Sequence, residues 1–281
     1  MSVLVSLVVM VGMLVIVPLG LRLVEPPGRP GGGRPSGLPA LRRLWPVPAA
    51  LGAVALWLPR GPAAGLLASC YGLATVALAL QAPLRLARTR SLAPAEIAVL
   101  TALVTPAVAG TALVAVCWGR PLFGFGPSVL ALTVAHFHFA GFAAALVASL
   151  AGRVAPGRAG RFAALSVPSG TLLVLVGFFT GDWTELAGAV VLTAGMWTVA
   201  LLTWRELRSR APDRLTGTLL AVSACVLVAT MLLALSWALG EATGIAHPDL
   251  SWMAATHGVG NALGFALCSI LALRRLKENT V

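Results

Sequence analysis

The sequence has few charged residues, since only 10% of its 281 positions are Asp, Glu, Lys or Arg, against 58% hydrophobic residues. A soluble domain needs polar side chains to cover its surface, and this chain has too few of them. The mean hydropathy of +0.92 indicates the same. These values exclude an ordinary soluble domain and predict an all-α, polytopic bundle of transmembrane helices.

Acidic residues are scarcer than basic ones, nine against 20, which gives a formal net charge of +11. A strong basic excess is typical of nucleic-acid-binding proteins, but here the basic residues fall between apolar runs and form no single basic face. Membrane topology explains the charge better, and we expect no nucleic-acid partner.

The sequence also lacks closely spaced cysteines, and its first apolar run lacks the usual signals of a cleavable leader. Cys70, Cys117, Cys225 and Cys268 stand alone in apolar runs, without the C-x-x-C spacing that is typical of a metal knuckle or a redox pair. The first apolar run has no basic n-region and no A-x-A cleavage site, so we interpret it as a retained helix. No cofactor is predicted from these patterns.

About nine apolar runs, most of them near 20 residues and bounded by charge, Pro or Gly, are predicted to span a bilayer. The second run is short and contains Pro46 and Pro48, so part of it is expected at the membrane interface. No internal repeat relates the runs, which disfavours transporters built from inverted halves. The predicted spans are residues 2–24, 44–59, 62–82, 93–118, 126–150, 162–180, 184–204, 215–240 and 251–273.

Arginine placement predicts the orientation of these spans, because basic residues collect in cytoplasmic loops. Of the 20 basic residues, only Arg60 and Arg120 fall in the other set of loops. The N-terminus is therefore predicted outside and the C-terminus in the cytoplasm. The basic residues of the cytoplasmic set are Arg22, Arg29, Arg34, Arg42, Arg43, Arg85, Arg88, Arg90, Arg153, Arg158, Arg161, Arg205, Arg208, Arg210, Arg214, Arg274, Arg275 and Lys277.

No loop is long enough to fold by itself outside the membrane, so we expect one integral-membrane domain over residues 1–281. The longest connection is a cytoplasmic Pro/Gly/Arg-rich linker over residues 25–43, whose composition cannot bury a core. Its arginines are expected to contact the anionic headgroups of membrane lipids.

Two of the four histidines, His136 and His138, lie inside the predicted fifth span, where an ionisable side chain indicates a functional site. Counted from the outer end of that span, both lie about 15–18 Å deep. Residues two apart on a helix point in nearly opposite directions, which disfavours one metal ion bound by both. We expect one imidazole to face a cavity and the other to bond a neighbouring helix, with Thr133 a local partner of His136.

The ninth span carries a second polar pair, His257 and Asn261, which are four residues apart and share one helix face. Their depths, about 9 and 15 Å from the outer end, approach the layer of the first pair. Gly260 and Gly264 form a small-xxx-small pattern that predicts close approach of another helix. The two pairs are therefore predicted to line one intramembrane pocket that opens outward.

This constellation admits two kinds of chemistry. A buried neutral imidazole can accept or relay a proton, and Asn can orient a carbonyl or hydroxyl group. Alternatively His136, His138 and His257 could hold Zn or Fe, but no Asp or Glu lies at that depth to complete a two-His, one-carboxylate set. We therefore rank acid–base use above metal use, with Glu241 and Asp249 at the outer entrance.

Two stretches resemble the bacterial YndJ-like membrane proteins. The first runs from Cys117-Trp118-Gly119-Arg120 through Ala135-His136-Phe137-His138-Phe139, and the second is Thr256-His257-Gly258 with Asn261. The resemblance implies that the two histidine motifs are the specific part of a shared site, and it does not settle the activity. Phe139 stands where many relatives are expected to have Tyr. The bacterial cytoplasmic (inner) membrane is the expected location.

Three functions fit these residues. The first is an integral-membrane enzyme of the isomerase, cyclase or hydrolase type, in which His136, His138, His257 and Asn261 catalyse proton transfer on a lipophilic small molecule. The second is a multi-pass transporter in which the same histidines bind substrate or protons. A receptor or assembly subunit with purely structural histidines is the third. Thr133, Phe139, Trp118, Glu241 and Asp249 are the predicted substrate contacts.

Overall fold

A computed structural model describes residues 2–24 and 37–279 and shows a helical protein without a strand in these ranges. Eight of its helices are long and apolar enough to cross a membrane. The prediction of an all-α, multi-pass bundle is confirmed. Two compact units divide the chain: unit 1 is Met1–Leu92 with Val99–Ala143, and unit 2 is Ala93–Ala98 with Ala144–Val281.

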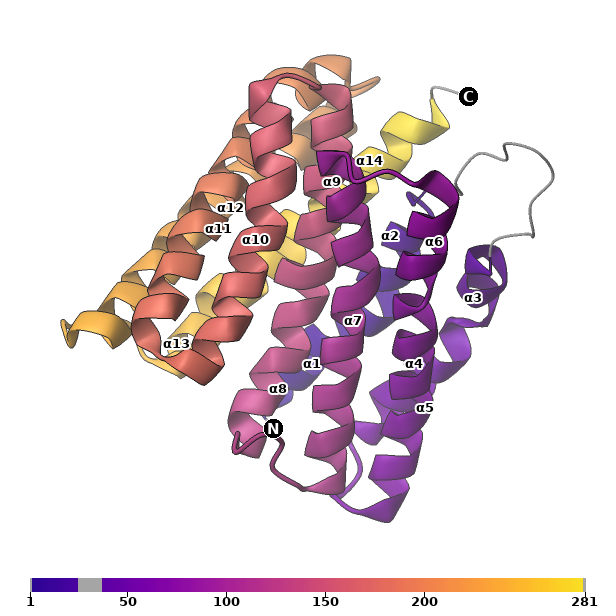
Figure 1. Ribbon diagram of the computed structural model, residues 1–281, viewed down its shortest axis with the longest axis vertical. Helices are drawn as coiled ribbons and strands as arrows, with labels where there is room; N and C mark the ends of the chain where they lie inside the picture. The colour runs from indigo at the N-terminus through magenta and orange to yellow at the C-terminus, as the bar shows by residue number, and fades with distance from the viewer. Residues whose placement is uncertain (1, 25–36, 280–281) are drawn as a thin grey trace. The chain divides into compact units, whose positions relative to one another are not determined.

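Unit 1 contains most of the chain from the N-terminus to the middle of the predicted fifth span (Figure 1). The segments labelled η1 and η2 are π-helical turns inside longer helices. The elements are α1 (Val3–Val11), η1 (Gly12–Ile16), α2 (Val17–Leu21), α3 (Leu38–Leu44), α4 (Pro46–Ala55), α5 (Pro62–Ala79), α6 (Gln81–Thr89), most of α7 (Pro94–Trp118), α8 (Pro127–His136) and η2 (Phe137–Ala143).

Unit 2 contains the start of α7 and the rest of the chain. Its helices α10, α11 and α12 are neighbours in sequence and pack side by side (Figure 1). The elements are α9 (Ala144–Val154), α10 (Arg158–Thr180), α11 (Asp182–Leu202), η3 (Thr203–Leu207), η4 (Arg208–Arg210), α12 (Arg214–Thr243), α13 (Leu250–Met253), η5 (Ala254–Gly258), η6 (Gly260–Leu267) and α14 (Cys268–Glu278).

The predicted second span contains a short helix, since α4 has only ten residues and is not among the eight long helices. It continues α3 through Trp45, which has helical backbone angles; its N–H donates to Leu41 O and its carbonyl accepts from Ala49 N. Pro46 and Pro48 donate no backbone N–H, so the helical hydrogen-bond pattern is interrupted near Trp45, where α3 ends and α4 begins. The short, Pro-rich character of this span was predicted correctly.

Most of the other helices extend past the predicted apolar runs into the flanking basic residues. The seventh predicted span, residues 184–204, lies in a helix that covers Asp182–Arg210. Arginine is a good helix former, so the helix continues where the hydropathy falls. Of the predicted linker, residues 25–36 lie outside the described residues, and Leu38 begins α3.

A π-helical turn early in the chain explains the position of Trp45 in unit 1. In η1 the carbonyl of Gly12 accepts from Val17 N, five residues on, so the next carbonyl, that of Met13, would need an N–H at residue 18. Residue 18 is proline and has none. The indole Nε1 of Trp45 donates to Met13 O at 3.0 Å instead, and this bond fastens the start of α4 to the first helix.

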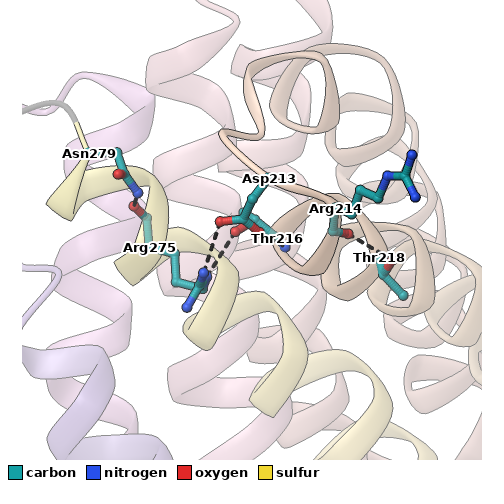
Figure 2. A network of polar contacts seen from close by, with 6 residues as sticks. All are labelled: Asp213, Arg214, Thr216, Thr218, Arg275 and Asn279. Carbon is teal, nitrogen blue, oxygen red and sulfur yellow. Dashed lines mark hydrogen bonds and ion pairs between the residues drawn. The ribbon is translucent and has the colours of Figure 1, made fainter.

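A polar network joins the start of α12 to the end of α14 in unit 2 (Figure 2). Asp213 accepts from Thr216 N at 2.8 Å and so caps α12. Arg275 donates to the other carboxylate oxygen of Asp213 at 2.8 Å and to the hydroxyl of Thr216 at 2.9 Å. The backbone bond and then the arginine bond lower the pKa of Asp213 to about 2.

Two more arginines make contacts at the same end of unit 2. Arg153 donates to Glu96 at 2.7 Å, and Arg210 donates to the carbonyl of Val154 at 3.4 Å. Basic residues from the end of α9, from the α11–α12 connection and from α14 therefore gather at one end of this unit. This distribution is the one that the positive-inside rule predicts for the cytoplasmic side.

Candidate functional site

His138 is enclosed in unit 1 and is bonded at both ring nitrogens. Its exposed fraction is 0%, as is that of Tyr71 on α5. The carbonyl of Val134 lies 2.6 Å from Nδ1, and a carbonyl can only accept, so Nδ1 carries the proton. Nε2 then accepts from the Tyr71 hydroxyl at 2.5 Å. His138 is thus a neutral imidazole that links two helices.

Close backbone packing completes the enclosure of His138. A Cβ added at Gly12 would lie 2.8 Å from the Cβ of His138, so the first helix passes directly against this side chain. The ring of Tyr71 stacks on the imidazole at 5.9 Å and meets the Trp45 ring edge-on at 5.6 Å. The imidazole is therefore held among ring and backbone atoms of unit 1.

His136 takes a different direction from His138. It is half-buried, and its ring meets Phe137 edge-on at 5.5 Å. Thr133, the expected partner of His136, donates its hydroxyl to Val129 O at 2.9 Å. The expectation that one of the two histidines bonds a neighbouring helix is met by His138.

The two aromatic residues predicted to contact substrate in unit 1 both take part in packing. Phe139 is buried, with 5% of its surface exposed. Trp118 is half-buried at the end of α7, and a Cβ added at Gly65 would lie 2.4 Å from its ring. Their predicted role as substrate contacts stays a prediction.

The second polar pair lies in unit 2 and is built around Thr230 on α12. The Thr230 carbonyl accepts from Nδ1 of His257 at 2.8 Å, which assigns the proton of this imidazole to Nδ1. The Thr230 hydroxyl donates to Oδ1 of Asn261 at 2.9 Å. That bond orients the amide so that Nδ2 lies 3.2 Å from Nε2 of His257. One residue therefore fixes both members of the pair.

Glycine allows the ninth span to approach α12 at this point. A Cβ at Gly260 would lie 2.8 Å from Cγ2 of Thr230, and one at Gly264 would lie 2.7 Å from Cγ1 of Val226. The predicted close approach at the small-xxx-small pattern is confirmed. The same stretch is π-helical in η5 and η6, and such turns are frequent at functional sites.

The predicted entrance residues of unit 2 both have local partners. Glu241 lies 3.1 Å from Nε2 of His247, whose Nδ1 lies 3.0 Å from Pro248 O. Asp249 caps α13 by accepting from Trp252 N at 2.9 Å. Bonds from the Ser251 hydroxyl and then the Trp252 amide lower the pKa of Asp249 below its ordinary value. Both carboxylates lie outside the polar pair itself.

The side chains that normally supply metal ligands are dispersed in the described part of the chain. Within residues 2–24 and 37–279, no group of three or more His, Cys, Asp or Glu side chains is placed to hold a metal ion. Metal binding by His136, His138 and His257, the alternative that the sequence leaves open, stays a prediction.

The model of one protein family, described as YndJ-like protein, matches residues 7–265. The chain belongs to the YndJ-like family. No curated protein and no solved structure matches it. The match includes both histidine motifs and the residues that bond to them, so the whole set belongs to the part of the chain that this YndJ-like protein shares with its family.

Two residues of this YndJ-like protein that hold the histidines were not predicted from its sequence. Tyr71 is the only tyrosine of the chain, which is a signal that could have drawn attention to it. Thr230 is one of several hydroxyl residues in its span and has no such signal. His136 and His138 lie in unit 1 while His257 and Asn261 lie in unit 2, and the single shared pocket stays a prediction.

Proposed function

We propose that this protein is an integral-membrane enzyme that uses an intramembrane histidine for acid–base chemistry on a lipophilic small molecule. The observation that carries the proposal is the arrangement of His257. Its Nδ1 proton is held by the Thr230 carbonyl, so Nε2 is the basic nitrogen, and Asn261 stands beside it. A general base needs this kind of fixed tautomer.

The roles of the site residues follow from these contacts. Nε2 of His257 takes a proton from the substrate and returns one to it. The Asn261 amide donates a hydrogen bond to the substrate oxygen that carries the developing charge. His138 is enclosed and bonded at both nitrogens, which favours a supporting role for it rather than proton transfer to substrate.

An enzyme is favoured over a transporter by the course of two helices. Alternating access commonly uses broken helices, and Pro106 and Pro168 are prolines of the predicted fourth and sixth spans that could break them. Both prolines lie inside continuous helices, α7 and α10. A bacterial cytoplasmic membrane is the proposed location, with membrane lipids as neighbours and the substrate entering from the lipid phase.

Deuterium incorporation tests the proposal while the substrate is still unidentified. The purified protein in proteoliposomes is incubated with a bacterial lipid extract in D₂O, and untargeted mass spectrometry compares the extract with a protein-free sample. We expect a lipid that gains deuterium at carbon or changes its retention time. His257→Gln should abolish the change, because the amide cannot cycle a proton, and Asn261→Leu should reduce it about 100-fold.

The matched control is His247→Gln, which alters a histidine of the same unit outside the polar pair and should leave the change intact. Thermal unfolding checks that each variant folds. Equal conversion by His257→Gln and the native protein would refute the enzyme. Protein-dependent movement of an unaltered lipid across the bilayer, with no conversion, would instead support the transporter.

A further inference from the structure

The hydrogen-bonding groups around His257 select a class of substrate for the proposed function. Of the donors and acceptors in this cluster, Nδ1 of His257 is bonded to the Thr230 carbonyl, and Oδ1 of Asn261 is bonded to the Thr230 hydroxyl. The capacity that can face a ligand is the Nε2 lone pair of His257 and the N–H groups of Asn261. The cluster therefore offers one acceptor next to one donor.

The contact between these two groups is weak enough to be exchanged for a ligand. Nδ2 of Asn261 lies 3.2 Å from Nε2 of His257 and 3.4 Å from Nδ1, so it is not aligned with the Nε2 lone pair, and both distances exceed the usual hydrogen-bond distance of about 2.9–3.0 Å. Both side chains are half-buried, so each keeps part of its surface exposed. A ligand that hydrogen-bonds to both the Asn261 amide and Nε2 of His257 would replace this weak contact. Separating the two side chains would therefore cost little free energy.

A hydroxyl group matches this pair better than other oxygen groups do. Its O–H can donate to Nε2 while its oxygen accepts from the Asn261 amide, so both protein groups are satisfied by one atom. A ketone or aldehyde can accept from Asn261 but has no proton for Nε2. The donor–acceptor pattern therefore distinguishes an alcohol from a carbonyl compound.

The surroundings of the pair are uncharged along the helices that carry it. In the described part of unit 2, α12 has no Asp, Glu, Lys or Arg between Arg214 and Glu241, and the ninth span has none between Asp249 and Arg274. An ionised carboxylate, phosphate or ammonium group placed at His257 would lose hydration without meeting an opposite charge. These lipids are disfavoured at the site.

We infer that the site around His257 and Asn261 binds an uncharged lipophilic alcohol, with its hydroxyl between Nε2 and the amide. The inference rests on the site of the proposed function and specifies the substrate class of that function. In this position the hydroxyl donates its proton to Nε2 of His257 as a hydrogen bond, and its oxygen accepts from the Asn261 amide.

Nitrogen NMR of ¹⁵N-histidine-labelled protein in detergent micelles tests the inference by binding alone. The chain has four histidines, so four imidazole sets are expected, and His257→Gln identifies one of them. The probes share a twelve-carbon chain: 1-dodecanol, dodecanal, dodecanoate, dodecylamine and dodecane. We expect a saturable shift of the His257 Nε2 signal with 1-dodecanol, weaker binding of dodecanal, and no saturable shift with the other three.

Two variants connect the shift to the proposed position. Asn261→Leu keeps the His257 signal and removes the amide, and should raise the dissociation constant of 1-dodecanol about tenfold. His247→Gln should leave the titration unchanged. A 1-dodecanol titration with no shift at His257, or one matched by dodecane or dodecanoate, would overturn the inference.

The results separate this inference from the proposed function. Binding of 1-dodecanol at His257 without any His257-dependent deuterium incorporation would refute the enzyme and retain the alcohol site. His257-dependent conversion of an ionised lipid would retain the enzyme and refute the alcohol site.

Discussion

Tyr71 and His138 meet at an Oη–Nε2 distance of 2.5 Å, at a place where neither side chain is exposed. The bond joins α5 to the fifth span, two segments that are 67 residues apart in the sequence. Because the other imidazole nitrogen donates to Val134 O, the hydroxyl of Tyr71 is the donor that satisfies Nε2. The contact therefore depends on how both helices pack.

Tyr71→Phe should destabilise the protein by about 1–2 kcal/mol, because Nε2 of His138 loses its donor inside a buried site. Reversible unfolding in mixed micelles would measure the change in free energy. Thr111→Val is the matched control, since that exposed hydroxyl only bonds Ala107 O within its own helix. An equal effect of the two substitutions on the free energy of unfolding would show that the Tyr71 bond stabilises the protein no more than a bond within one helix.

Gly12→Ala should destabilise unit 1 by about 1–3 kcal/mol through overpacking. The added methyl would lie 2.8 Å from Cβ of His138, which is itself held at both nitrogens and cannot move away cheaply. Thermal unfolding in the same detergent would report the loss. Gly126→Ala serves as the comparison, because nothing lies within 4 Å of its added Cβ. A stable Gly12→Ala protein would contradict the close packing.

The bond between Asp213 and Arg275 should persist from neutral pH down to about pH 4. The pKa of Asp213 in the folded protein is about 2, below its ordinary value, so the contribution to stability is present above the unfolded pKa and is lost as the pH falls toward 2. The protection factors of the α14 amides, measured by hydrogen exchange at a series of pH values, should fall with this loss in the native protein. Asp213→Asn should show faster exchange already at pH 7, with little change on acidification.

Glu278→Gln provides the control for the acid titration, since Glu278 pairs with Arg274 within the same helix and is largely exposed. It should leave the pH dependence of exchange at α14 as it is in the native protein. Exchange that speeds up at pH 5 to 6 in the native protein would be inconsistent with the low pKa of Asp213.

Cysteine labelling should confirm the predicted orientation. Arg120 and Arg161 are both exposed and flank different loops, the first predicted outside and the second cytoplasmic. In a background without the four native cysteines, Arg120→Cys should react with a membrane-impermeant maleimide in intact cells. Arg161→Cys should react only after lysis, and the reverse result would invert the topology.

The fold class and most spans could be predicted from the sequence because hydropathy and charge are properties of short segments. Span ends were less accurate, as at residues 184–204, since a helix continues into arginines that hydropathy excludes. Pro46 and Pro48 correctly indicated that the second span is short, because a missing N–H acts locally. The π-helical turn at Gly12–Ile16 had no comparable signal.

The candidate site was predictable in its histidines and not in their partners. His138 and His257 attract attention because an ionisable group is costly in an apolar span. Their contrast was not predictable: His138 is enclosed by Tyr71, while His257 remains half-buried beside Thr230. Each partner lies on another helix, and its direction depends on how that helix is rotated.

The sequence by itself determined a helical membrane protein, the approximate positions of its spans, and the polar residues that lie within them. These follow from the free energy of transferring each segment into the bilayer. Tertiary structure decided which nitrogen of each histidine carries the proton and which partner each imidazole meets. The physical reason is that the carbonyl of Thr230 and the hydroxyl of Tyr71 meet the imidazoles only after the helices have packed.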